Sequence, residues 1–194
     1  MKHLSLAKPH LIVMVGIPGS GKSFFAEKFA NTFGAPYICE KKIAALAPGG
    51  EHAELALLQL DELLKTKQSI IFDGSSHTRT ERATLSKKAH DRSYDILYIW
   101  VQTDQGTAKA RATSAKKTSD YSSITAEEYD KALKRFTAPN VAEKPLVISG
   151  KHTYASQAKV VLKKLSTPRA EISTNHSISA IRPERPKSRN IIIR

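Results

Sequence analysis

The residues from Gly16 to Ser23 read G-I-P-G-S-G-K-S, which fits the pattern G-x-x-x-x-G-K-S. Glycines at these positions let backbone N–H groups turn inward around phosphate oxygens, and the lysine supplies positive charge to the β and γ phosphates. The hydroxyl of Ser23 is suited to coordinate a Mg²⁺ ion that bridges the same oxygens. The pattern therefore predicts a site for ATP and Mg²⁺ in which Lys22 is also catalytic. The predicted binding residues are Gly16, Gly19, Ser20, Gly21, Lys22 and Ser23.

The elements expected around this motif distinguish a phosphate-binding loop from a glycine-rich turn that caps a helix. Residues 11–15 form a continuous apolar run that ends in glycine, which predicts a buried strand of a parallel sheet. Residues 22–32 predict a helix that packs through its phenylalanines. A strand before the loop and a helix after it are the setting of a P-loop, where phosphates meet the positive end of the helix dipole.

A carboxylate is expected at the end of another strand. Ile70, Ile71 and Phe72 form an apolar run that ends in Asp73. In a parallel sheet this position lies beside the P-loop, so Asp73 is the Walker-B candidate and the second predicted Mg²⁺ ligand. The next residue is Gly74, not the glutamate that many ATPases use to orient water, which favours transfer to an acceptor over hydrolysis. The alternative for Asp73 is a strand-end aspartate that forms a turn.

Basic residues follow the expected fourth strand at Lys109, Arg111, Lys116 and Lys117. Phosphoryl transfer needs positive charge on the γ phosphate, and a basic lid can supply this charge while excluding water. We therefore predict that Arg111 is a catalytic lid residue. A solvated helix face is the alternative for this stretch.

Strand and helix patterns alternate along the chain, which predicts an α/β fold. The expected strands are residues 11–15, 36–39, 69–72, 95–101 and 146–148, and the expected helices are residues 22–32, 51–67, 78–91, 104–117, 125–136 and 154–165. A loop containing glycine and proline is expected between the second strand and the second helix. Right-handed crossovers then give a P-loop NTPase three-layer sandwich, with about five parallel strands, helices on both faces and a lid after the fourth strand.

Two regions are expected in the chain of 194 residues. Residues 1–166 form the predicted P-loop domain. Residues 167–194 contain six basic and two acidic residues together with three prolines at 168, 183 and 186, and predict a basic, disordered tail.

The composition favours a phosphate-rich partner and a reducing compartment. Thirty-one Lys and Arg residues against eighteen Asp and Glu residues give a formal charge of +13. Such a charge draws RNA or another acidic partner to the basic surface and tail, or only keeps the surface solvated. Cys39 is the only cysteine, and no apolar run is long enough to span a membrane, so we expect a cytoplasmic protein with neither a disulfide nor a membrane anchor. The seven histidines show no metal-ligand spacing.

With these elements in order, residues 11–165 resemble a group of P-loop kinases. This group includes the kinase domains of polynucleotide kinases, small kinases similar to zeta toxins and to antibiotic phosphotransferases, and AAA-type ATP-binding proteins. The segments that carry the resemblance are GIPGSGKS, IIFDGSSHTRTERATLSKKAH with Asp73 and Arg82, YIWVQTDQGTAKARAT with Arg111, and FTAPNVAEKPLVIS with Pro139 and Glu143. The resemblance implies an ATP-dependent kinase in which Arg111 is the lid arginine.

The chain departs from this group after the second strand. Such kinases usually place an aspartate there, often followed by arginine, as the base toward the acceptor hydroxyl. Here the sequence reads Cys39-Glu40-Lys41-Lys42. Either Glu40 replaces the aspartate as catalytic base, or the acceptor differs, or acceptor activation is lost.

Three functions are therefore compatible with the sequence. The favoured one is a kinase that phosphorylates an unidentified hydroxyl acceptor, either a nucleic-acid 5′-hydroxyl or a small molecule. The alternatives are an ATPase or nucleotide switch without an acceptor, and an RNA-binding protein with a secondary nucleotide site. A GTPase is disfavoured, because the chain lacks the N/T-K-x-D sequence that reads guanine and Asp73 does not begin a D-x-x-G pattern.

Overall fold

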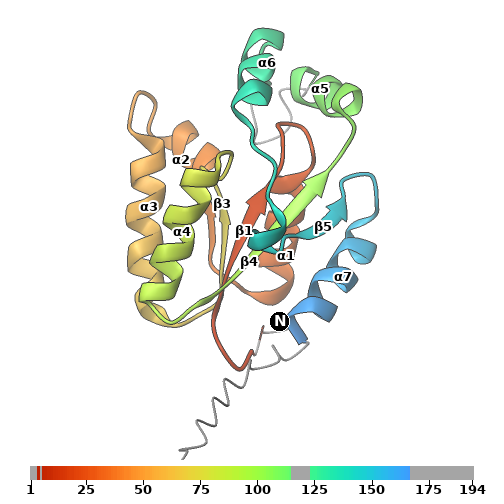
Figure 1. Ribbon diagram of the computed structural model, residues 1–194. Helices are drawn as coiled ribbons and strands as arrows, with labels where there is room; N and C mark the ends of the chain where they lie inside the picture. Colours follow the sequence, from red (N-terminus) through yellow and green to blue (C-terminus); the bar gives the residue numbers. More distant parts are fainter. Residues whose placement is uncertain (1–3, 5, 115–122, 167–194) are drawn as a thin grey trace, which may run out of the picture.

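The computed structural model describes residue 4 and residues 6–114 and 123–166, and a parallel sheet of five strands forms its centre (Figure 1). The strand order is β2-β3-β1-β4-β5. The strands are β1 (His10–Val15), β2 (Tyr37–Cys39), β3 (Ile70–Asp73), β4 (Asp95–Gln102) and β5 (Leu146–Ser149). All four pairings are parallel, and the central strand β1 pairs with β3 and β4.

Helices cover both faces of this sheet. Helices α1 (Lys22–Phe33) and α7 (Tyr154–Ser166) lie on one face, and helices α3 (His52–Leu63) and α4 (Arg79–Asp91) lie on the other (Figure 1). Alternate residues of β1 belong to the two separate cores, because successive side chains of a strand point to opposite faces. Ile12 and Met14 pack with α1 and α7, and their neighbours in β1 pack with α3 and α4. The predicted three-layer sandwich is confirmed.

The lid contains two helices, α5 (Gln105–Thr113) and α6 (Ala126–Arg135), above the carboxyl ends of the strands (Figure 1). The predicted capping box of α6 is present, since Thr125 and Glu128 each accept a hydrogen bond from the backbone N–H of the other. Buried Ala108 of α5 and Tyr129 of α6 pack with Ile17 of the P-loop. The lid therefore rests directly on the P-loop.

The segment after β2 differs from the sequence expectation. Helix α2 (Glu40–Leu46) occupies residues for which we expected a loop. None of its seven residues is buried, so it lacks the buried apolar face that makes a helix recognisable in a sequence. The next helix, α3, ends at Leu63 and continues as the 3-10 turn η1 (Leu64–Thr66), a few residues inside the expected end at 67.

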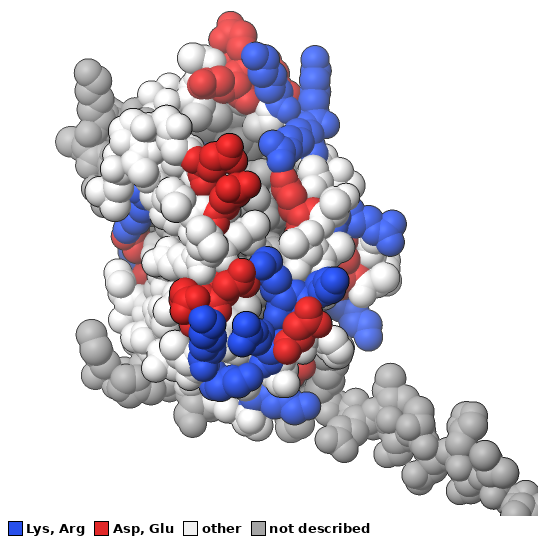
Figure 2. All heavy atoms as spheres, turned by 90° about the vertical axis from the view of Figure 1, so that its left-hand side faces the viewer, with Lys and Arg blue, Asp and Glu red and all other residues white. Residues whose placement is uncertain are grey.

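Some expectations lie outside the described residues. These are the basic tail at 167–194, its assignment as a separate region, and the lid lysines at 116 and 117. None of the helices in the described part of the chain has the length and apolar character needed to cross a bilayer. The face formed by α3 and α4 carries acidic and basic side chains that are interleaved (Figure 2), among them the ion pair of Lys88 with Asp61 at 2.8 Å.

A buried arginine joins α4 to the segment between the lid and β5. The side chain of Arg82 is completely buried, and its Nε donates to Oε1 of Glu143 at 2.6 Å. Its Nη1 donates to the carbonyls of Ser76 at 3.1 Å and Thr137 at 2.9 Å. Glu143 ends the 3-10 turn η2 (Val141–Glu143) and caps it together with Asn140. Arg82 therefore fixes the loop after β3 against the chain that descends from the lid.

We expect Glu143→Ala to lower the free energy of unfolding by about 3 kcal/mol, because the charge of Arg82 would stay buried without its carboxylate. Urea denaturation measures the change. The control is Glu62→Ala, which removes the exposed ion pair of Glu62 with Lys65 and should cost less than about 1 kcal/mol. Equal costs for the two variants would contradict the structural role of the Arg82–Glu143 pair.

Candidate active site

The P-loop joins β1 to α1, and its backbone conformation needs glycine. Gly16, Gly19 and Gly21 have φ values of 148°, 75° and 104°, which side chains rarely allow. A Cβ on Gly19 would lie 2.0 Å from the carbonyl oxygen of Ala108 in α5. The loop can therefore take this shape, in contact with the lid, only with glycine at that position.

Lys22 lies over the P-loop. Its Nζ donates to the carbonyls of Gly16 at 2.8 Å and Ile17 at 3.0 Å. Burial lowers the pKa of Lys22 from 10.5 to about 8, while the charge of Asp73 opposes this shift and that of Lys41 adds to it. The lysine is thus a half-buried cation whose ammonium group is held by two backbone carbonyls.

The P-loop also contains an unpaired hydroxyl. Ser20 Oγ is buried and has no hydrogen-bond partner among the described residues. An orphaned donor and a half-buried cation beside a loop of left-handed glycines suit an anion with several oxygen atoms. These residues therefore fit the phosphates of a nucleotide.

Asp73 ends β3 next to the P-loop strand and is 6% exposed. Its Oδ2 accepts a hydrogen bond from the hydroxyl of Tyr37 at 3.3 Å, and the thiol of Cys39 lies 4.0 Å from the same oxygen. No group of three or more His, Cys, Asp or Glu side chains in the described residues is arranged to hold a metal ion. Ser23 and Asp73 could therefore hold Mg²⁺ only together with phosphate oxygens, as is usual for this ion.

Glu40 lies on the same edge of the sheet as Asp73. Cys39 is paired with Asp73 in the strand register, and Glu40 follows as the first residue of α2. Its Oε2 accepts a hydrogen bond from Ser75 Oγ at 2.8 Å. The structure thus places both predicted carboxylates at the ends of neighbouring strands, with Glu40 partly exposed and fixed by Ser75.

Arg111 is exposed and lies near the rim of the P-loop. Its Nη1 donates to the carbonyl of Gly150, at 3.0 Å, in the loop after β5. Gly150 touches the P-loop, because a Cβ there would lie 2.0 Å from the carbonyl oxygen of Ser20. Lys109, by contrast, pairs with Asp130 of α6 at 2.9 Å and so holds the two lid helices together.

His77 is a site residue that the sequence analysis missed. It follows β3 in the loop fixed by Arg82, and its carbonyl accepts a hydrogen bond from Thr137 N at 2.8 Å. Burial, together with the charges of Lys22 and Arg135, lowers the pKa of His77 from 6.5 to about 4, against the opposing charges of Glu81 and Asp73. A neutral imidazole therefore lies within reach of the charge of Lys22. The sequence signal for His77 was its position four residues after Asp73, because loops that follow the carboxyl ends of parallel strands line the binding site in such folds.

The sheet order with the phosphate loop between β1 and α1 defines a P-loop NTPase. Residues 11–139 match the family described as "AAA domain", and this match covers more than half of the chain. The chain therefore belongs to the AAA domain family.

A sequence relative comes from a virus. A protein of Acanthamoeba polyphaga mimivirus, named as a bifunctional polynucleotide phosphatase/kinase, is 29% identical over 103 residues. The match covers 53% of this chain and 23% of the viral protein. The chain thus corresponds to less than a quarter of that relative.

Solved structures share the fold. A gluconokinase from Sinorhizobium meliloti 1021 gives a TM-score of 0.60 at 18% identity, over 81% of this chain and 91% of the kinase. Kti12 from Chaetomium thermophilum, solved in complex with ADP-AlF3, gives 0.62 at 16% identity, over 81% of this chain and 100% of that chain. These likenesses confirm the fold expected from the resemblance to P-loop kinases.

Gly19→Ala should weaken ATP binding at least about tenfold and destabilise the fold by more than Gly49→Ala does. Both glycines have left-handed φ values, 75° and 81°, but a Cβ on Gly49 would meet no atom within 4 Å. Gly49→Ala therefore measures the backbone strain alone, about 1 kcal/mol. Calorimetric ATP titration and thermal unfolding of the two variants test the close contact with α5. Equal effects would contradict it.

Lowering the pH from 7 to 4 should reduce the free energy of unfolding of the native protein more than that of a His77→Asn variant. The difference between the two losses should be at most about 3 kcal/mol. The reason is that the native pKa of His77, about 4, lies below its ordinary 6.5, so the unfolded chain gains a proton first as the pH falls. Urea denaturation across this range gives the difference. His90→Asn, at an exposed imidazole, is the control. Parallel pH profiles for the native protein and His77→Asn would contradict the burial of a neutral imidazole.

Proposed function

We propose that the protein is an ATP-dependent kinase that transfers the γ-phosphoryl group to a hydroxyl acceptor. The observation that carries this proposal is the convergence of Lys22, Asp73 and Glu40 at one edge of the sheet, beneath a lid that packs on the P-loop. Gly74 follows Asp73 where many ATPases have a glutamate to orient water, which favours an acceptor over water. The fold of the solved kinases and the name of the viral relative agree with this reaction class.

The proposed roles follow from the positions of the side chains. The P-loop backbone and Ser20 hold the phosphates, and Lys22 leaves its two carbonyl partners to contact the β and γ oxygens. Ser23 and Asp73 hold Mg²⁺, which when bound neutralises charge on the phosphates. Arg111 lies at the rim, where its charge can act on the nucleotide from the side of the loop after β5.

Glu40 is the proposed base toward the acceptor. Its carboxylate is partly exposed, and Ser75 fixes one oxygen so that the other can take the proton of an incoming hydroxyl. Lys41 lies on α2 together with Glu40, and its charge contributes to the lowered pKa of Lys22. It would attract an acceptor that carries phosphate. A nucleic-acid 5′-hydroxyl and a phosphorylated small molecule both meet this requirement. RNA binding by the basic tail and a cytoplasmic location remain predictions from the sequence.

Two substitutions separate the roles of the carboxylates. Asp73→Asn should lower both acceptor phosphorylation and background ATP hydrolysis about tenfold or more, because a metal-organising carboxylate serves every reaction of the nucleotide. Glu40→Gln should lower phosphorylation about 100-fold and leave ATP affinity and hydrolysis near normal, because a general base acts on the acceptor alone. Lys22→Ala, which should abolish both reactions, is the inactive control.

The measurement uses γ-labelled ATP with 5′-hydroxyl RNA, 5′-hydroxyl DNA, nucleotide sugars, aminoglycosides and nucleosides as candidate acceptors. The labelled product identifies the acceptor class, and the same assay then compares the variants. Undiminished transfer by Glu40→Gln would remove Glu40 from the mechanism. Release of label only as inorganic phosphate, whatever acceptor is added, would replace the kinase by an ATPase or nucleotide switch.

A further inference from the structure

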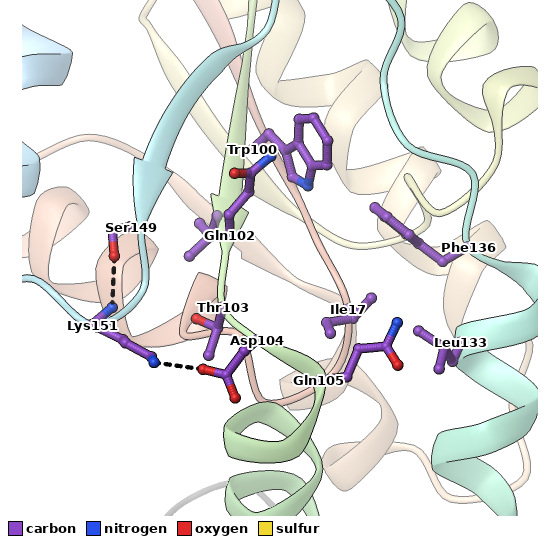
Figure 3. A pocket seen from close by; sticks show the side chains of 11 residues that line it. Ile17, Trp100, Gln102, Thr103, Asp104, Gln105, Leu133, Phe136, Ser149 and Lys151 are labelled. Atoms are coloured by element: carbon purple, nitrogen blue, oxygen red, sulfur yellow. Dashed lines mark hydrogen bonds and ion pairs between the residues drawn. The ribbon is translucent and has the colours of Figure 1, made fainter.

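A pocket of about 480 Å³ lies under the lid, between the P-loop and the ends of β4 and β5. Trp100, Phe136 and Ile17 all line this pocket, and Figure 3 shows Trp100 on β4 and Phe136 on the chain that leaves α6. Leu133 of α6 completes the apolar wall. The polar lining is formed by Gln102, Thr103, Asp104, Gln105, Ser149 and Lys151.

This pocket is distinct from the phosphate cradle. The carbonyl of Ile17 accepts the hydrogen bond from Lys22, whereas its side chain lines the pocket and packs with the lid. Trp100 belongs to the core on the α3 and α4 side of the sheet, whereas α1, whose first residue is Lys22, covers the opposite face. The pocket therefore shares Ile17 with the P-loop, whereas Ser20, Lys22 and Ser23 do not line it.

The charged groups of the lining neutralise each other. Asp104 and Lys151 form an ion pair at 2.6 Å, drawn in Figure 3, and Asp104 also caps α5 through Thr107 N. The remaining polar groups are neutral amides and hydroxyls. Among the described residues that line the pocket, the one cation, Lys151, is paired with Asp104, so an uncharged ligand suits the pocket better than a phosphate.

We propose that this pocket is a second binding site, which takes an uncharged, flat heteroaromatic group of nucleobase size. Trp100 and Phe136 are both in the lining, and each offers an aromatic surface on which such a ring can stack. The amides of Gln102 and Gln105 offer both donors and acceptors to the N–H and C=O groups of its edge. A ring held there contacts Ile17 of the P-loop and Leu133 of the lid together, so its binding is linked to the position of the lid.

Trp100 is the only tryptophan of the chain, so its fluorescence reports this pocket directly. We expect adenosine, guanosine or cytidine to quench the emission to a saturating level. Phe136→Ala should raise the midpoint concentration about tenfold, because a stacking surface is lost. Gln105→Ala should raise it as well, whereas Gln59→Ala, at an exposed glutamine of α3, should leave it unchanged.

Lys22→Ala separates this inference from the proposed kinase function. The variant should lose ATP binding and keep the nucleoside quench, because Lys22 does not line the pocket. Quenching that disappears in Lys22→Ala, or that both pocket variants leave unchanged, would overturn the proposal. So would emission that no nucleoside and no short oligonucleotide alters.

Two further measurements complete the test. Circular dichroism and thermal unfolding verify that each variant is folded, and Phe136→Leu replaces Phe136→Ala where the latter is not.

A quench by nucleosides points to a free small molecule, and a quench by a short oligonucleotide alone points to a base of a nucleic-acid strand. Both results support a site for a flat heteroaromatic group.

Discussion

The backbone of the P-loop is in direct contact with two other parts of the chain. A Cβ on Gly19 would lie 2.0 Å from the carbonyl of Ala108 in the lid, and one on Gly150 would lie 2.0 Å from the carbonyl of Ser20. The absence of side chains at these two glycines is therefore what lets the lid and the loop after β5 approach the phosphate cradle. Gly19 also has a left-handed φ, which residues with a side chain rarely adopt, so the loop conformation itself requires glycine there. Because these contacts are between backbone atoms, the cradle cannot change shape without moving the lid or the loop after β5.

The buried guanidinium of Arg82 extends this connection to the opposite side of the site. It binds the carbonyls of Ser76 and Thr137, and the hydroxyl of Ser76 donates to the carbonyl of Met14 in the central strand at 2.7 Å. The loop between Asp73 and α4 is thus fixed both to the sheet and to the chain descending from α6. His77 lies in this loop, so the arrangement of the lid and that of the imidazole depend on the same buried ion pair. A closing movement of the lid would act on the carboxylate side of the site through this network.

The features that the sequence predicted are those with a local or periodic signal. The apolar run of β1 and the capping box at Thr125 each depend on neighbouring residues, and both are confirmed. The glycines and the lysine of the loop lie between β1 and α1 as expected, and their contacts with a nucleotide stay a prediction. Helix α2 was missed because it has only seven residues and packs on the core through the half-buried Ile43, which is too short an apolar pattern to indicate a helix. The partners of Arg82 and the contact between Arg111 and Gly150 join residues far apart in the chain. Such contacts depend on the crossover connections, and no spacing in the sequence reveals them.

The phosphate cradle and the pocket beneath the lid differ in charge, and they therefore suit different ligands. In the cradle, burial has removed water from Lys22, and its partners are carbonyl oxygens, which hold a cation less strongly than a phosphate would. In the pocket beneath the lid, the two charged residues of the described lining are paired with each other, so its attraction for a ligand comes from rings and amides. Ile17 belongs to both, through its carbonyl in the cradle and its side chain in the pocket. The carbonyl of Ile17 also accepts a hydrogen bond from Ser20 N at 3.2 Å, so Ile17 stays fixed in the loop and packed against the lid when Lys22 turns to the phosphates. The two sites therefore share one residue of the P-loop, while the groups that would hold each ligand are different.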